Sequence, residues 1–295
     1  MNLSRLLEEG RFVVTGELVP PRSPDPGVVR RAAQRLRGLV DAVNVTDNAT
    51  ARVGMTPLAA AMLAAGEGLD PVLQLTCRDR NRLALTADLL GAHALGIRAV
   101  LCLSGDPMEV GRTGAKPVFD LDAVGLARLA TDLGQGRAPG GTTIDPPAHF
   151  LVGVAEAPGA DPSGGDRLAA KADAGATFAQ TQPIYDVAQF ATWLNRLAAR
   201  GLPDRVAILA GILPPTSAAQ LERFATLPGW SVPDAVLARM RTARDQRAEG
   251  IALAAEMVQA VRTHGVRGIH LMGLGTSGVP EVAHAAGLLP RPVPA

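Results

Sequence analysis

The stretch Ala99-Val100-Leu101-Cys102-Leu103-Ser104-Gly105-Asp106-Pro107 changes from wholly apolar to polar within one residue. Its first five residues show no polar alternation, which is typical of a strand covered on both faces, as in a parallel sheet. The segment Val206-Ala207-Ile208-Leu209-Ala210 has the same character. The polar turn after Leu103 then predicts where such a strand ends.

Similar apolar runs recur along the whole chain, and helical patterns lie between them. We count eight runs, at residues 12–18, 42–46, 71–76, 99–103, 150–155, 178–181, 206–212 and 268–274. The stretch 233–264 is too long for one helix of a compact barrel, so we expect two helices broken near Gly250. A terminal helix is expected over 280–286.

Eight strand–helix units in 295 residues predict a (β/α)8 TIM barrel that forms a single catalytic domain over residues 1–295. A doubly wound open sheet is the alternative. The least regular stretch, residues 134–147, is rich in Gly, Pro and Thr. We interpret it as a surface loop within the domain, because the strand–helix rhythm resumes directly after it.

Composition excludes several classes of function. The 29 Lys and Arg residues nearly balance the 28 Asp and Glu residues, so the chain lacks the charge of a nucleic-acid-binding protein. No apolar run approaches the roughly 20 residues of a membrane span, and the first residues do not resemble a signal peptide. With only Cys77 and Cys102, a disulfide framework is excluded and a cytoplasmic location is expected. The five histidines have no zinc-ligand spacing, so no metal is expected.

Glu17 is the strongest single candidate for a catalytic residue. The carboxyl ends of barrel strands face the active-site mouth, and Glu17 lies near the end of the first apolar run. A carboxylate there is costly to bury unless it is paired or protonated. Burial would raise its pKa and make it a usable general acid. A salt bridge to Arg22 or to another arginine at a strand end explains the residue equally well.

Other polar strand ends have structural explanations beside functional ones. Asp106 suits an Asx turn before Pro107. The segment 76–81 suits a helix N-terminus, with Asp79 near the cap and Arg80 on a solvated face. Gln182 could bind the amide edge of a heterocycle, or it could be a satisfied buried amide.

Two further motifs are weak. Lys171 could form a Schiff base, but its position within a helical segment speaks against that. Residues 273–278 match G-x-G-x-x-G, yet no strand follows to complete a dinucleotide fold. A helix N-terminus at the last loop could still hold a phosphate.

Seven short motifs in order resemble the methylenetetrahydrofolate reductases. They are ELVPPR at 17–22, VTDN at 45–48, QLTCRDRN at 74–81, GDP at 105–107, KADAGA at 171–176, TQP at 181–183 and GILP at 211–214. Each motif is short, but seven in family order form a specific signal. The closing segment, residues 268–281, resembles a shorter bacterial branch of the family.

The resemblance implies a barrel that holds FAD at the carboxyl ends of its strands. Members of the family reduce 5,10-methylenetetrahydrofolate to 5-methyltetrahydrofolate in one-carbon metabolism and methionine biosynthesis. NADH or NADPH gives a hydride to the flavin, and the folate then replaces the nicotinamide in a ping-pong scheme. The resemblance does not distinguish between NADH and NADPH.

The resemblance also assigns roles to individual residues. Glu17 matches the catalytic general acid, and Asp106 matches an aspartate between flavin and pterin. Gln182 matches the glutamine that holds the pterin, and Tyr185 lies near it in the substrate site. The positions expected to contact the cofactor are Thr46, Asn48, Gln74, Thr76, Ser104, Gly105, Asp106, Ala157 and Lys171.

Departures from the family pattern keep alternatives open. Gln74 stands where many relatives carry a histidine, and Ser104 replaces an arginine. One alternative is a flavin-independent enzyme with direct hydride transfer. Others are a folate-binding barrel in methyl transfer that depends on a partner subunit, and a barrel retained only for binding or assembly. A homo-oligomer is also compatible with the sequence.

Overall fold

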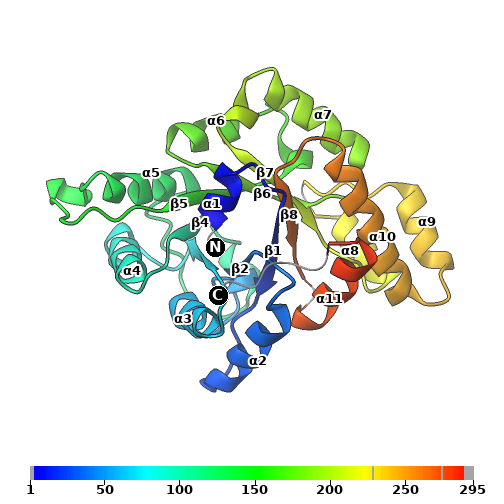
Figure 1. Cartoon of the computed structure of the whole chain (residues 1–295), viewed down its shortest axis with the longest axis horizontal. Helices are drawn as coiled ribbons and strands as arrows, with labels where there is room; N and C mark the ends of the chain where they lie inside the picture. Colours follow the sequence, from blue (N-terminus) through cyan, green and yellow to red (C-terminus); the bar gives the residue numbers. More distant parts are fainter. Residues whose placement is uncertain (1–2, 228, 274, 289–295) are drawn as a thin grey trace.

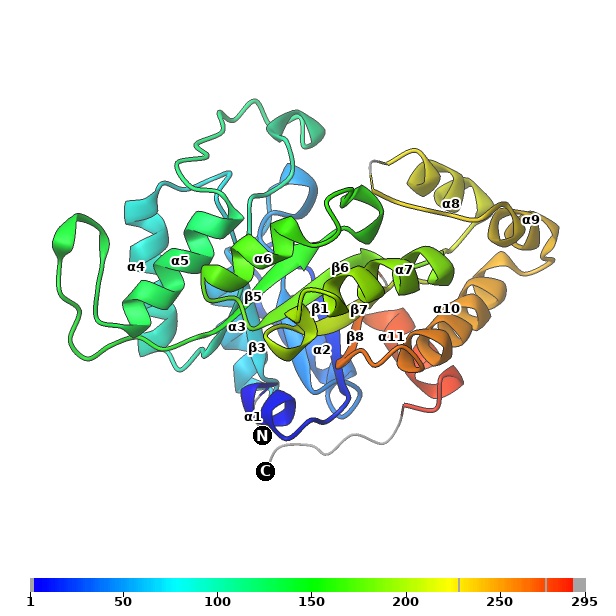
Figure 2. The same cartoon turned by 90° about the horizontal axis from the view of Figure 1, so that it is seen from above.

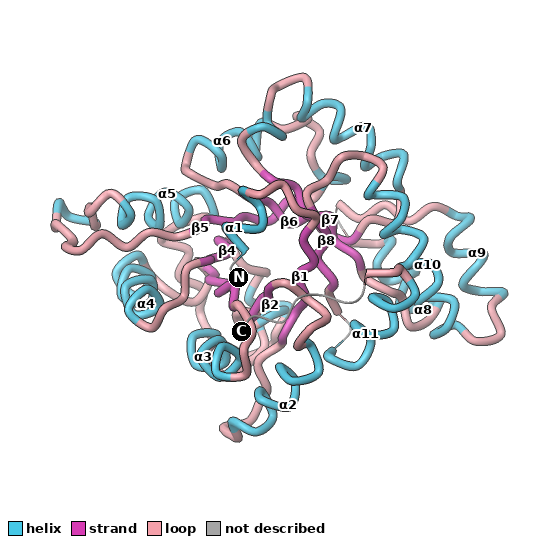
Figure 3. Tube along the Cα trace, in the orientation of Figure 1, coloured by secondary structure: helices cyan, strands magenta, loops and turns pink. Residues whose placement is uncertain are grey.

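The computed structural model describes residues 3–227, 229–273 and 275–288, and it shows a closed barrel of parallel strands surrounded by helices (Figures 1 and 3). Neighbouring strands pair in sequence order, and β8 closes the ring on β1. The strands are β1 (Val13–Leu18), β2 (Ala42–Val45), β3 (Pro71–Thr76), β4 (Ala99–Leu103), β5 (Leu151–Glu156), β6 (Phe178–Pro183), β7 (Ala207–Ile212) and β8 (Gly268–Leu271). The predicted barrel is confirmed, and the open sheet is excluded.

Helices follow the strands and form the outer layer. The longer ones are α2 (Pro26–Leu36), α3 (Pro57–Gly66), α4 (Arg82–Ala94), α5 (Ala123–Gly134), α6 (Asp166–Asp173), α7 (Val187–Ala198), α8 (Ala218–Ala225), α9 (Asp234–Thr242), α10 (Gln246–Arg262) and α11 (Gly275–Ala285). A short α1 (Leu3–Glu8) precedes the barrel. Within the described residues, no helix has the length and apolar content needed to span a membrane.

Residues 233–264 contain two helices, as expected, but the predicted break near Gly250 is wrong. The break lies between Thr242 and Gln246, where Asp245 caps α10 by accepting a hydrogen bond from the Ala248 amide. Gly250 lies inside α10, and a Cβ there would lie 1.8 Å from the carbonyl oxygen of Pro215. The glycine therefore permits a close approach of two backbones rather than ending a helix. The terminal helix α11 begins at Gly275, five residues before the predicted start.

Alternation along the strands creates two separate cores. On β1, Val14 and Leu18 belong to the layer between barrel and helices, whereas Val13 belongs to the barrel interior. The interior core also contains Phe178 and Leu209, and α1 closes it with Leu3, Leu6 and Leu7. Figure 2 shows α1 (dark blue) at one end of the barrel, while the connection after β4 rises at the other. The ends of the barrel are therefore unlike, with an apolar floor and a polar mouth.

The connection over residues 134–147 is irregular, as expected. It contains one turn of 3-10 helix, Pro139–Gly141, and a single antiparallel bridge between Arg137 and Thr143. Ala148 then packs into the outer core just before β5 begins.

Candidate active site at the barrel mouth

A buried polar layer crosses the barrel beneath its mouth. Gln180 of β6 donates to Asn44 Oδ1 (3.1 Å) and Thr15 Oγ1 (3.2 Å), and Asn44 donates back to Gln180 Oε1 (2.7 Å). Thr15 Oγ1 lies 2.9 Å from His270 Nδ1. Burial lowers the pKa of His270 to about 4, so the ring is neutral near pH 7. This layer fixes the strand ends on which the site is built.

Glu17 lies two residues above Thr15 on β1, and so points to the same side of the strand, into the mouth. Its Oε2 accepts a hydrogen bond from the backbone amide of Gly273 (2.9 Å). Desolvation raises the pKa of the carboxyl group, and the Gly273 amide opposes this in part. Among the described residues no arginine forms an ion pair with Glu17, so the salt bridge to Arg22 is absent. The group has the environment of a general acid.

A β-bulge in β6 presents Gln182. Gln180 pairs with Leu209, but Pro183 pairs with Gly211, so β6 has one more residue than β7 over this interval. The hydroxyl of Thr181 stabilises the irregularity by accepting from the Gly211 amide (2.9 Å). Bulges of this kind re-aim side chains beside active sites. The side chain of Gln182 is half-buried at this strand end.

Tyr185 lies behind this strand end rather than in the open mouth. Its hydroxyl donates to the carbonyl oxygen of Leu213 (2.7 Å), and burial raises the pKa of the phenol. The ring lies beside Trp230 in a small apolar cluster with Leu221 and Met240. Its hydroxyl therefore already has an acceptor within the protein.

A buried carboxylate organises the ends of β2 and β3. Asp47 Oδ2 accepts from both the amide (2.8 Å) and the hydroxyl (2.9 Å) of Thr76. Arg80 donates two further hydrogen bonds to the same carboxylate, at 2.6 and 3.0 Å. Arg80 therefore does not lie on a solvated face, and the cap of α4 is Asn81 rather than Asp79. Sequence reasoning missed this pair because Asp47 and Arg80 are 33 residues apart.

A second pair fixes the next turn. Arg78 is 1% exposed and binds Asp79 through two hydrogen bonds of 2.7 Å. Asn48 donates to Asp79 (3.2 Å) and accepts from the amide of Gly54 (3.1 Å). These contacts connect the loop after β2 with the loop after β3.

The loop after β4 joins the same group. Gly105 has φ of +97°, and a Cβ there would lie 2.8 Å from the Cβ of Arg78, so only glycine fits. Asp106 is exposed, and its carboxylate accepts from the Thr50 amide (3.0 Å). Ser104 is exposed and accepts from the Ala123 amide (3.1 Å) at the start of α5. Asp106 therefore braces a neighbouring loop instead of forming an Asx turn.

The remaining candidates fall into two groups. Gln74 and Thr46 are buried at the ends of β3 and β2, and the hydroxyl of Thr46 has no hydrogen-bond partner within the described residues. Ala157 is half-buried just beyond β5. The structure thus brings Thr46, Asn48, Thr76, Gly105 and Asp106 together over β2–β4, while Ala157 and Lys171 lie apart, over β5 and α6.

Lys171 is buried and already paired. Its ammonium donates to Glu156 Oε1 (2.7 Å) and to the carbonyl oxygen of Ala155 (2.6 Å). The other oxygen of Glu156 is buried without a described partner. Glu156 ends β5 in the sequence, but nothing in the sequence shows that it would neutralise a lysine 15 residues later.

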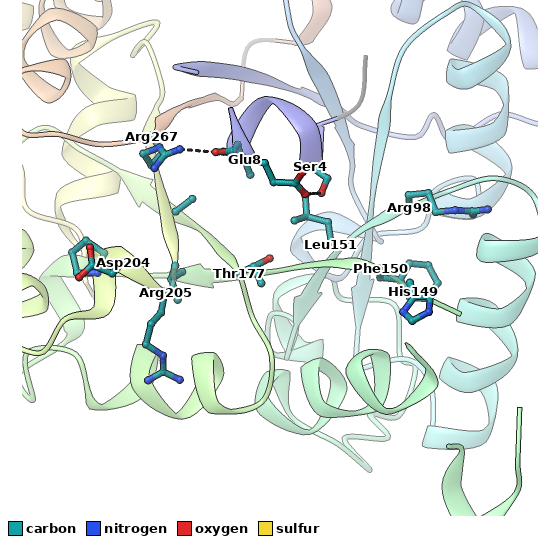
Figure 4. Close-up of a pocket in the computed structure, with 14 residues that line it drawn as sticks. Ser4, Glu8, Arg98, His149, Phe150, Leu151, Thr177, Asp204, Arg205 and Arg267 are labelled. Atoms are coloured by element: carbon teal, nitrogen blue, oxygen red, sulfur yellow. Dashed lines mark hydrogen bonds between the residues drawn. The ribbon is translucent and has the colours of Figure 1, made fainter. Parts of the chain in front are cut away.

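Cavities lie at both ends of the barrel. One of about 190 Å³ opens at the mouth, between the loops after β1 and β2, and is lined by Thr46, Asn48 and Arg52 among others. A larger one of about 570 Å³ lies at the floor, where Arg98, Arg205 and Arg267 surround apolar residues (Figure 4). The larger cavity contains none of the predicted site residues.

Comparisons with known proteins point to one family. A family model described as methylenetetrahydrofolate reductase matches residues 2–287. The 5,10-methylenetetrahydrofolate reductase of Pectobacterium carotovorum subsp. carotovorum is 29% identical over 306 residues, which cover 98% of this chain and 95% of that protein. The protein of the same description from Escherichia coli (strain K12) is 27% identical over 235 residues, covering 76% and 72%. Methylenetetrahydrofolate reductase 1 of Schizosaccharomyces pombe is 26% identical, but the match covers only 33% of that longer protein.

Solved structures support the fold. An uncharacterised protein from Clostridium thermocellum, described as binding two copies of 5-methyl-5,6,7,8-tetrahydrofolic acid, superposes with a TM-score of 0.67. That match has 14% identity and covers 97% of this chain and 98% of the other. An oxaloacetate acetylhydrolase superposes with a TM-score of 0.53 at 13% identity, covering 92% and 78%. At such identities the likeness shows the barrel and nothing finer.

Proposed function

The chain belongs to the methylenetetrahydrofolate reductase family of oxidoreductases, and from this premise we propose that it reduces 5,10-methylenetetrahydrofolate to 5-methyltetrahydrofolate with NADH or NADPH as the electron source. The observation that carries the proposal is Glu17, a carboxylic acid with a raised pKa at the mouth of the barrel. We also propose that residues 1–295 act as one catalytic unit in the cytoplasm.

The reaction needs a proton donor at the pterin. Opening the methylene bridge releases a ring nitrogen that must be protonated before or as the hydride arrives. Glu17 supports this role because desolvation raises the pKa of its carboxyl group and so favours the protonated form, and the Gly273 amide orients the group. In our proposal Glu17 gives that proton, and solvent restores it after product leaves.

Gln182 is the proposed pterin ligand. Its amide offers both a donor and an acceptor, which match the amide edge of a pterin. The bulge in β6 supports the role because it sets the side chain apart from the regular ladder. Asp106 is proposed to lie beside the reacting rings, and its bond to the Thr50 amide holds it in place. Tyr185 is proposed to support the substrate site from behind.

The residues at β2–β4 fit the ring end of FAD. Gln74 is a buried amide in β3, and its donor and acceptor atoms suit the heteroatoms of a flavin ring. We propose that Thr46, Asn48, Gln74, Thr76, Ser104, Gly105, Asp106 and Ala157 surround the cofactor. When bound, FAD would supply the hydride-carrying chemistry that links the nicotinamide to the folate.

One observation favours a second candidate, a flavin-independent reductase. Lys171 is among the positions expected to contact the flavin, and a lysine there would suit its phosphates, but the charge of Lys171 is neutralised by Glu156. A buried lysine that already has a carboxylate partner is a poor phosphate ligand. In this candidate, NADH or NADPH occupies the mouth and gives its hydride directly to the folate, while Glu17 keeps the same role.

Two measurements test the proposal. Oxidation of NADH or NADPH by the purified protein should depend on 5,10-methylenetetrahydrofolate and should yield 5-methyltetrahydrofolate in equal amount. Nucleotide oxidation that ignores the folate, or none at all, would contradict the reductase. The visible spectrum separates the two candidates, because a bound flavin gives an absorbance band that NAD(P)H bleaches. A colourless protein that still reduces the folate would establish the flavin-independent reaction.

A further inference from the structure

The cavity between the loops after β1 and β2 carries positive charge that the protein itself does not neutralise. Arg22 and Arg52 line it, together with Val19, Thr46, Asn48 and Gly54. Both arginines are exposed, and neither forms an ion pair within the described parts of the chain. The two nearby arginines Arg78 and Arg80, by contrast, are each bound to a carboxylate.

Thr46, which lines the same cavity, has a buried hydroxyl without a hydrogen-bond partner among the described residues. The residue is 2% exposed. A hydroxyl buried without a partner is costly, and such groups are rare in folded proteins. A ligand oxygen that entered the cavity would provide the missing acceptor.

The wall of the cavity is strained and held in place. Asn48, Thr50 and Ala51 have φ of +43°, +55° and +55°, a left-handed conformation that costs free energy for residues other than glycine. Asn48 is held through Asp79 and the Gly54 amide, and Thr50 through Asp106. A loop held in strain by three separate hydrogen bonds is preorganised to receive a ligand.

The cavity also lies beside the proposed acid. Thr46 is the residue after β2, and its amide donates to the carbonyl oxygen of Leu18, the neighbour of Glu17. The cavity therefore borders the strand that carries Glu17, and one substrate molecule would have to span only a short distance to reach both. Both substrates of the proposed reaction carry oxyanions, which are the glutamate carboxylates of the folate and the phosphates of the dinucleotide.

We propose that this cavity is an oxyanion site, in which Arg22 and Arg52 bind a carboxylate or phosphate of a substrate and the hydroxyl of Thr46 donates to the same group. Arginine suits such a site because its guanidinium group binds planar oxyanions through paired hydrogen bonds. The proposal extends the proposed function, since it assigns the anchoring of the substrate to residues outside the reacting centre.

Binding measurements test the site without relying on turnover. We would measure the Kd of NADH, NADPH, 5-methyltetrahydrofolate and 5-methyltetrahydropteroate, which lacks the glutamate, by calorimetry. Arg22→Ala and Arg52→Ala should each raise the Kd of the ligand whose oxyanion enters the cavity, by about tenfold or more. The difference in Kd between variant and wild type should shrink at high salt. Arg11→Ala is the matched control, because Arg11 is also exposed and lies at the opposite end of β1.

The pattern of change identifies the oxyanion. A weaker Kd for the dinucleotides alone would assign their phosphates, and a weaker Kd for 5-methyltetrahydrofolate but not for the pteroate would assign the glutamate. Unchanged values for every ligand, or changes equal to those of Arg11→Ala, would overturn the site. Thr46→Val should weaken the same ligand severalfold while it raises the Tm of the free protein, because it removes an unsatisfied hydroxyl.

A final arm separates this proposal from the function on which it rests. If the wild-type protein binds neither folate nor dinucleotide, the proposed function fails. Inorganic pyrophosphate then remains as the probe of the site. It should raise the Tm of the wild type and of Arg11→Ala, but not of the variant that carries both Arg22→Ala and Arg52→Ala. Equal shifts in all three proteins, or no shift in any, would reject the oxyanion site.

Discussion

The two ends of this barrel differ in the side chains that close them, which are apolar at the floor and polar or charged at the mouth. At the floor, Leu3, Leu6 and Leu7 of α1 close an apolar interior. At the mouth, Asp47 and Arg80 form a buried ion pair, and Thr46 and Glu156 each retain a buried oxygen that has no partner among the residues the structure describes. The floor is closed by apolar packing, whereas the mouth retains buried polar groups that a ligand would satisfy. This contrast teaches that stability and chemistry are divided between the two ends, as in other barrels of this type.

The largest expected effect of a single change is at Asp47 in the mouth. Asp47→Asn removes the buried carboxylate that binds Arg80 and leaves Arg80 only the partly exposed Asp88, so we expect the free energy of unfolding to fall by about 3–5 kcal/mol. Asp132→Asn is the control, because its ion pair with Arg137 is exposed, and it should cost at most about 1 kcal/mol. Urea denaturation measures both. Equal losses would show that the mouth is not held by buried charge.

Shortening an apolar side chain at the floor should lower the stability of the protein and leave catalysis intact. Leu3 is fully buried beneath the barrel, so Leu3→Ala should lower the free energy of unfolding by about 2–5 kcal/mol. Leu83 is 76% exposed, and Leu83→Ala should change it by less than about 0.5 kcal/mol. The kcat of folate reduction should stay near the wild-type value in both variants. A large fall in kcat for Leu3→Ala would contradict the division between the ends.

The buried polar layer should make stability depend on pH. His270 binds fewer protons in the folded state, because burial lowers its pKa from 6.5 to about 4. The contribution of neutral His270 to the free energy of unfolding is therefore complete above pH 6.5. As the pH falls toward 4, the free energy of unfolding decreases by on the order of 3 kcal/mol. Stability measured from pH 7 to 4 should show this slope in the wild type and in His284→Gln, where the histidine is exposed. His270→Gln should reduce the slope, and an unchanged slope would contradict a buried neutral ring.

Local pattern predicted the barrel because the strands lie in short runs that are largely apolar, and β4 is apolar throughout. Val100 and Cys102 face the helices while Leu101 faces the interior, so both faces are apolar and the run has no alternation. The floor was not anticipated, because the six residues of α1 carry no start or stop signal of their own. The break assigned to Gly250 was wrong for a related reason, since the contact that requires glycine comes from Pro215.

Glu17 was identifiable from the sequence because a carboxylate is unusual in a strand that is otherwise mostly apolar. Its partner was not, since the Gly273 amide lies 256 residues away. The ion pairs Asp47–Arg80 and Glu156–Lys171 were also not predictable, because their charged groups come together only in the folded barrel. The bulge that presents Gln182 depends on the register of β6 against β7, which no local pattern encodes.

The most direct test of the account is the rate of folate reduction in Glu17→Gln as a function of pH. The amide fills the same space and cannot give a proton, so we expect kcat to fall about 10²–10⁴-fold while the Kd of 5-methyltetrahydrofolate changes little. The wild-type rate should decline as the pH rises through the raised pKa of Glu17, and the variant should lack that decline. A Glu17→Gln protein that keeps both the wild-type rate and the wild-type pH profile would contradict Glu17 as the proton donor.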